Sequence, residues 1–151
     1  MLYQLAKASP IAIAALALAG CETIAEPVAE SLSPTYTAAL TGAAEVGAAG
    51  DPDGSGTAEI SLVDDVVNQV CYEIAVTGIS PATAAHIHSG AAGVAGPPVV
   101  TLEAPTSGEV SGCASADDDT IDAIRANPAA FYVNVHTADH PGGAIRGQLR
   151  R

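Results

Sequence analysis

The residues with the clearest potential for chemistry are two histidines, His86 and His88, separated by a single residue. Because successive side chains of a β-strand point to opposite faces, this spacing places both imidazoles on one face, about 6–7 Å apart. The next segment, 89–98, holds three glycines and two prolines, so it forms a loop with tight turns rather than a helix. A third histidine, His136, ends a later alternating segment and is the candidate partner of the first two.

Three neutral imidazoles from two strands would form a ligand set suited to zinc or copper, with an open position for water. Tyr132 and Asn134 are expected on the same face as His136, where they would orient the rings. Arg146 completes this surrounding set and is expected in a buried ion pair or as a clamp on backbone carbonyls. The alternative is structural: the histidines bond loop carbonyls and join the glycine loop to the last hairpin. We favour the structural role and assign no catalytic residue.

Strands must position these histidines, because short segments along the chain alternate between apolar and polar residues. A turn at 64–65 joins two of them into a hairpin. Three acids at 117–119 cap the one predicted helix, which ends before Pro128. Eight short strands with connections rich in glycine and proline predict an all-β antiparallel sandwich or barrel. The predicted strands are 36–41, 57–63, 66–76, 84–88, 99–102, 109–114, 131–136 and 144–149, and the helix covers 117–127.

The composition excludes one class of partner. The formal net charge is −12, with 5 basic and 17 acidic residues, whereas binding to a nucleic-acid backbone needs clustered Lys and Arg. The acidic segment 51–56 superficially resembles the start of a calcium loop, but it lacks the distal glutamate and the flanking helices. We therefore expect a solvated turn there.

The N-terminal residues are expected to be a targeting signal. Lys7 precedes an apolar segment at 11–19 that is too short to span a bilayer. Its last two residues begin the sequence Leu-Ala-Gly-Cys at 18–21. This sequence resembles a bacterial lipobox, which implies cleavage before Cys21 and acylation of that residue. The alternative is a plain secretory signal with an incidental cysteine. Residues 1–20 are thus expected to be a lipoprotein signal peptide, and 21–34 the acylated cysteine and a flexible tether.

Export would place the other two cysteines, Cys71 and Cys113, in an oxidising compartment. Both lie in predicted strands, so we expect them to form a disulfide that stabilises the domain by about 3–4 kcal/mol. Two buried free thiols are the alternative. Glu22, next to the acylated cysteine, fits sorting to the outer membrane. The expected location is therefore membrane-anchored, at the periplasmic face of that membrane or at the cell surface.

Three motifs together resemble a known family. They are His-Ile-His-Ser-Gly at 86–90 with its glycine loop, Tyr-Val-Asn-Val-His-Thr at 132–137, and Pro-Gly-Gly-Ala-Ile-Arg-Gly-Gln-Leu at 141–149. In these motifs the chain resembles the CHRD domain, which is named for chordin and also occurs alone in bacterial exported proteins. The resemblance covers roughly 35–149, and we assign the CHRD domain to 35–151. It implies a Greek-key-like β-sandwich similar to that of copper/zinc superoxide dismutase, with one short helix.

Superoxide dismutase also carries a His-x-His on its metal strand, so the resemblance lets His86, His88 and His136 stand for three copper ligands. No zinc ligand follows within 89–98. Two functions remain open. The favoured one is a non-catalytic, lipid-anchored envelope module that binds an unknown extracytoplasmic protein or surface ligand. The alternative is a copper- or zinc-binding protein with dismutase-like redox activity.

Overall fold

The computed structural model describes residues 34–47, 49–63 and 68–151 of the chain. The predicted signal peptide, Cys21, the tether up to residue 33 and the turn at 64–65 lie outside these residues. No helix in the described part is long and apolar enough to cross a membrane. The described elements are β1 (Thr35–Thr41), η1 (Gly42–Ala44), β2 (Ser55–Val63), β3 (Gln69–Thr77), β4 (Ala82–Ser89), β5 (Pro98–Leu102), β6 (Glu109–Ser115), α1 (Asp118–Ala126), η2 (Pro128–Ala130), β7 (Phe131–Thr137) and β8 (Ile145–Gln148).

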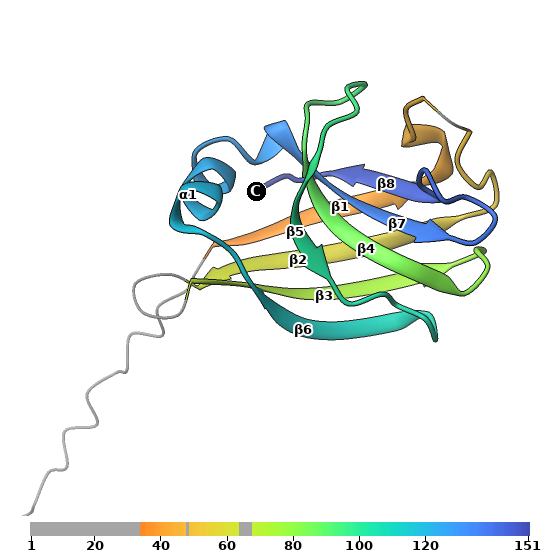
Figure 1. The fold of residues 1–151 in the computed structure, drawn as a ribbon, viewed down its shortest axis with the longest axis horizontal. Helices are drawn as coiled ribbons and strands as arrows, with labels where there is room; N and C mark the ends of the chain where they lie inside the picture. The colour runs from red at the N-terminus through yellow and green to blue at the C-terminus, as the bar shows by residue number, and fades with distance from the viewer. Residues whose placement is uncertain (1–33, 48, 64–67) are drawn as a thin grey trace, which may run out of the picture. The chain divides into compact units, whose positions relative to one another are not determined.

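All eight described strands belong to one antiparallel sheet, in the order β5-β4-β7-β8-β1-β2-β3-β6. In this order β3 and β4 lie in opposite halves of the sheet, each next to an edge strand, so the connection between them crosses from one half to the other (Figure 1). β8 lies in the middle, between β7 and β1. The edge strands β5 and β6 approach each other, so the sheet is nearly closed around its core. The predicted all-β antiparallel fold with one short helix is confirmed, as a single curled sheet; the likeness to superoxide dismutase stays a prediction.

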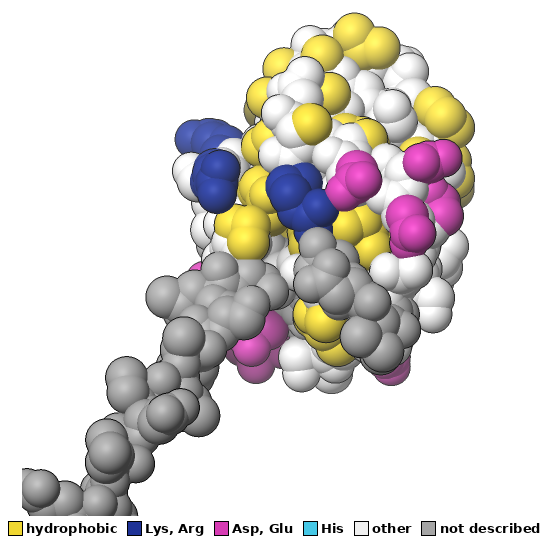
Figure 2. All heavy atoms as spheres, turned by 90° about the vertical axis from the view of Figure 1, so that its left-hand side faces the viewer, with side chains coloured by type: hydrophobic (Ala, Val, Ile, Leu, Met, Phe, Trp, Pro, Cys, Tyr) yellow, Lys and Arg dark blue, Asp and Glu magenta, His cyan; other side chains and the backbone are white. Residues whose placement is uncertain are grey.

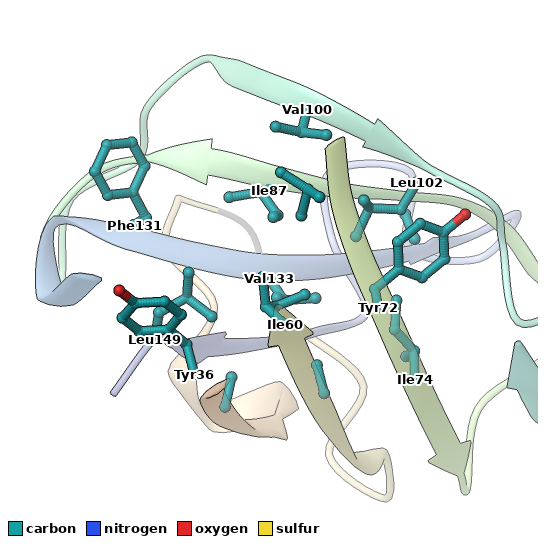
Figure 3. Close-up of a cluster of buried hydrophobic side chains, with 14 of the residues drawn as sticks. Tyr36, Ile60, Tyr72, Ile74, Ile87, Val100, Leu102, Phe131, Val133 and Leu149 are labelled. Atoms are coloured by element: carbon teal, nitrogen blue, oxygen red, sulfur yellow. The ribbon is translucent and has the colours of Figure 1, made fainter. Parts of the chain in front are cut away.

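The core lies inside this curled sheet and is formed by alternate residues of the strands (Figure 3). On β2, for example, Ala58, Ile60 and Leu62 are buried while Thr57 and Glu59 are exposed, as the alternation predicts. Burying a Val, Leu, Ile or Phe side chain contributes about 1.5–3 kcal/mol. The side chains labelled in Figure 3 come from β1, β2, β3, β4, β5 and β7 and from Leu149, so both halves of the sheet share one core.

The helix α1 begins and ends close to its predicted bounds. The Asp117 carboxylate caps it by accepting a hydrogen bond from the Thr120 amide at 2.7 Å, and this bond lowers the pKa of Asp117. Ile121 and Ile124 are buried against the core. On the outside, Arg125 pairs with Asp122 at 2.6 Å. Figure 2 shows the end of the domain beside α1, where basic and acidic side chains both lie at the surface.

A disulfide joins Cys71 of β3 to Cys113 of β6, as predicted. The two residues face each other directly in the antiparallel register, with 3.9 Å between their Cα atoms. Both side chains lie on the outer face of the sheet, and Cys113 is exposed. The bond therefore fastens the edge strand β6 to its only hydrogen-bonded neighbour in the described sheet.

Candidate metal centre

The three histidines come together on the outer face of β4 and β7. These strands are antiparallel neighbours, with His88 opposite Tyr132 and His86 opposite Asn134. His136 lies opposite Ala84, so it is diagonal to His86. We call the outer face of β4, β7 and β8 the histidine face; it carries His86, His88, Tyr132, Asn134, His136 and Arg146.

One nitrogen from each ring of His86, His88 and His136 lies within 4.8 Å of the other two. The closest pair is Nδ1 of His86 and Nε2 of His136, 3.2 Å apart. The ring centroids of the three residues are 5.1–6.0 Å apart. Among the described residues, this is the one cluster of three or more His, Cys, Asp or Glu side chains whose ligand atoms lie close enough together to hold a metal ion.

Backbone carbonyls determine which nitrogen of two rings carries the proton. Nδ1 of His88 lies 2.9 Å from the Gly96 carbonyl, and Nδ1 of His136 lies 3.1 Å from the Pro141 carbonyl. A carbonyl only accepts, so each Nδ1 donates and each Nε2 presents a lone pair. The His136 lone pair faces Nδ1 of His86. Nε2 of His88 is buried and has no hydrogen-bond partner among the described residues.

Burial favours the neutral form of His86 and His88. It lowers the pKa of His86, and the neighbouring His136 and His88 lower it further. Burial also lowers the pKa of His88; the hydrogen bond to Gly96 opposes this effect, while His136 and Arg146 add to it. At neutral pH both rings therefore favour the uncharged form, which is the form that binds metal.

Tyr132 connects His88 to the glycine loop. Its ring stacks on His88, with centroids 4.9 Å apart and planes 12° apart. Its hydroxyl accepts from the Gly96 amide at 3.2 Å and donates to the Gly96 carbonyl at 3.3 Å. The loop passes so close that an ideal Cβ on Gly96 would lie 1.5 Å from the Ser89 carbonyl oxygen, which requires glycine there. The carbonyl that orients His88 is thus itself held in place.

Arg146 clamps the same loop from β8. Its Nη2 donates to the carbonyls of Ala91 and Val94, at 3.0 and 2.9 Å. Its guanidinium carbon lies 3.3 Å from the centroid of the Tyr132 ring, on which it stacks. The side chain is only 2% exposed. The carbonyl clamp expected for Arg146 is therefore present, and the described contacts direct its Nη2 into the loop.

Asn134 and Glu45 form a second polar contact on this face. The Asn134 amide donates to the Glu45 carboxylate and, at 3.1 Å, to the Ile145 carbonyl. Burial raises the pKa of Glu45, although Asn134 and the charge of Arg146 oppose the shift. Asn134 was expected to orient a histidine, and its described hydrogen bonds go to these groups instead. Sequence reasoning assigned no role to Glu45, which lies 89 positions from Asn134 and carries no local signal of this contact.

His140 lies apart from the cluster. Its Nδ1 is 3.2 Å from the Ala49 carbonyl, and its Nε2 is 3.8 Å from an Asp51 carboxylate oxygen. Asp51 also accepts a hydrogen bond from the Asp53 amide at 3.1 Å, as in an Asx turn. Segment 51–54 thus forms a turn of the kind expected.

The fold and the site together define an all-β module with a three-histidine cluster on its outer face. The chain belongs to the CHRD domain family, whose model matches residues 36–149. The match reaches from β1 to Leu149, so the family resemblance seen in the histidine and glycine motifs is confirmed. Comparisons with curated proteins and with solved structures found no match.

Proposed function

We propose that this chain is a lipid-anchored CHRD protein of the cell envelope whose domain binds a transition-metal ion, copper or zinc, without catalysing a reaction. The observation that carries the proposal is the convergence of one nitrogen each from His86, His88 and His136 within 4.8 Å. The metal-binding role thereby gains support over the purely structural role favoured from the sequence.

The unpartnered Nε2 of His88 supports a ligand at this point. An unsatisfied buried polar atom costs about 1–3 kcal/mol, and buried polar groups usually have a partner. A metal ion would accept this lone pair. The hydrogen bonds from His88 and His136 to carbonyls support the same conclusion, because metal-binding histidines commonly donate their other N–H to such a group.

The ligand chemistry selects the class of ion. All three donors are imidazole nitrogens, which suit zinc and copper, whereas calcium and magnesium prefer oxygen. His86 and His136 are half-buried rather than buried, so an ion held here would keep an open side. The ligand from His86 would be Nδ1, after its proton moves to Nε2.

Binding without catalysis is supported by the contacts of Arg146. A dismutase-like site would need a cation that meets an incoming anion. The Arg146 guanidinium is buried, stacks on Tyr132 and donates to two loop carbonyls. This arrangement favours a role in holding the loop.

The anchoring part of the proposal rests on the lipobox-like sequence at 18–21 and on the composition of the tether. Two acyl chains or more on Cys21 would anchor the protein stably. The Cys21→Ser variant should lose acyl labelling and leave the membrane fraction. Membrane association equal to that of the parent would contradict the anchor.

Metal titration of the full chain tests the binding site. Metal-free protein should bind one zinc or copper ion and melt at a higher temperature with metal in excess. His88→Ala and His136→Ala should each weaken binding by more than about 100-fold, because they remove a ligand rather than a partner of a ligand. His140→Ala, outside the cluster, is the matched control and should bind as the parent does.

The same variants distinguish metal binding from a purely structural role of the histidines. If excess zinc and copper leave the melting temperature unchanged while His88→Ala and His136→Ala both lower it, the histidines only join the loop to the strands. The metal-binding proposal would then be wrong.

A further inference from the structure

The histidine cluster has a fixed positive charge beside it. Arg146 is the one buried Lys or Arg side chain in the described part of the chain. Its guanidinium, the Tyr132 ring and the His88 ring form a column, because Tyr132 has Arg146 at 3.3 Å and the His88 ring at 4.9 Å. The charge therefore lies about one aromatic ring away from a candidate ligand, within a largely buried column.

This charge acts on the cluster. The guanidinium is buried and lies one aromatic ring from His88, so its field disfavours added positive charge at that candidate ligand. Because imidazoles bind metal in their neutral form, three of them would leave a bound ion with its full charge. Glu45 carries the opposite charge: it interacts electrostatically with the guanidinium and accepts a hydrogen bond from the Asn134 amide. Arg146 and Glu45 thus act on the site with opposite signs.

We propose that Arg146 makes the histidine centre selective for monovalent copper, so that the domain binds Cu⁺ in preference to Zn²⁺. This inference rests on the proposed metal site and concerns which ion occupies it. A fixed positive charge repels a divalent ion twice as strongly as a monovalent ion at the same position. In a partly buried site this difference amounts to about tenfold or more in relative affinity. Three neutral nitrogens add no negative charge that would compensate a divalent ion.

Two substitutions at position 146 separate the charge from the loop contacts. Arg146→Gln removes the charge and keeps an amide that can donate to the loop carbonyls, whereas Arg146→Lys keeps the charge. The measured quantity is the affinity ratio of Cu⁺ to Zn²⁺ in the full chain, from competition with a chromophoric chelator. Ascorbate keeps the copper reduced. The ratio should fall about tenfold in Arg146→Gln and stay within about threefold of the parent in Arg146→Lys.

Glu45→Gln gives a second test that keeps the arginine side chain itself. Removing this negative charge leaves Arg146 less compensated, so the ratio of Cu⁺ to Zn²⁺ affinity should rise by about threefold or more. Glu73→Gln, on the exposed outer face of β3, is the matched control. It removes the same charge far from the cluster and should leave the ratio unchanged, because salt screens exposed charges.

The outcomes are distinct. A parent protein that binds neither ion contradicts the metal site itself, and the selectivity with it. If the parent binds metal and the ratio of Cu⁺ to Zn²⁺ affinity is the same in the parent, Arg146→Gln and Glu45→Gln, only the role of Arg146 is contradicted. If Arg146→Gln does not fold, as circular dichroism would reveal, the Glu45→Gln ratio decides: an unchanged or lower ratio overturns the proposal.

Discussion

The two halves of the sheet have outer faces of different character. On the histidine face, Tyr132, Asn134 and Arg146 are all buried although they point away from the core, because the glycine loop and the segment around Glu45 contact them. The other outer face, that of β2, β3 and β6, carries Glu59, Glu73 and Glu109, all exposed; we call it the acidic face. Alternation thus determines which way a side chain points, and loops determine whether it is exposed.

The faces also differ in what holds their strands together. Hydrogen bonds from side chains to loop carbonyls connect the histidine face. The acidic face carries the Cys71–Cys113 disulfide, and its Glu59 lies directly opposite Glu73, which places like charges side by side. Three experiments test this contrast.

The largest effect is expected from the disulfide. Replacing Cys71 and Cys113 together by serine should lower the free energy of unfolding by about 3–4 kcal/mol, because the bond closes a loop between residues 42 positions apart. Chemical denaturation measures the change, with Ser111→Ala on the same face as the control. Metal affinity should be unaffected. A parallel loss of metal affinity would show that the two faces are not independent.

A smaller effect is expected from pH on the metal-free protein. The pKa values of His86 and His88 are lowered from 6.5 in the folded state, so below that pH the unfolded chain binds more protons than the folded protein does. Stability should therefore be flat above about pH 6.5 and fall as the pH drops below it.

Denaturation curves with EDTA between about pH 5 and 7.5 check this dependence. His88→Gln should show a shallower fall, because it removes one of the two groups. A slope of opposite sign would mean that the folded protein protonates the cluster more readily than the unfolded chain does.

The smallest effect concerns the acidic pair. Glu73→Gln should raise the free energy of unfolding by about 0.2–1 kcal/mol, since it relieves the repulsion from Glu59. The gain should shrink in high salt. Glu109→Gln is the matched control, because Glu109 lies directly opposite Ala75 and is only the diagonal neighbour of Glu73. Equal gains from both variants would assign the effect to net charge rather than to the pair.

Local periodicity was sufficient to predict most of the fold. Spacings of two residues predicted the inward face of β2 and the strand at 131–136. A spacing of three residues predicted the buried face of the capped helix. Periodicity also placed His86, His88 and His136 together once the family was recognised. It did not reveal the burial of Arg146 or the role of Glu45, because both depend on loops that return from distant parts of the chain. The curling of all strands into one sheet likewise depends on long-range pairing.

The central position of β8 has a consequence for how the chain folds. This strand lies between β7 and β1, and beyond it Thr37 pairs with Arg150 through two backbone hydrogen bonds. β1 is synthesised first of the described strands and β8 last, so the sheet cannot close until nearly all of these residues have been made. Pairings of such long range form slowly, since the loop entropy must be overcome first. A chain emerging from the ribosome would thus remain unfolded for most of its synthesis, which is the state that the proposed export through a membrane channel would require.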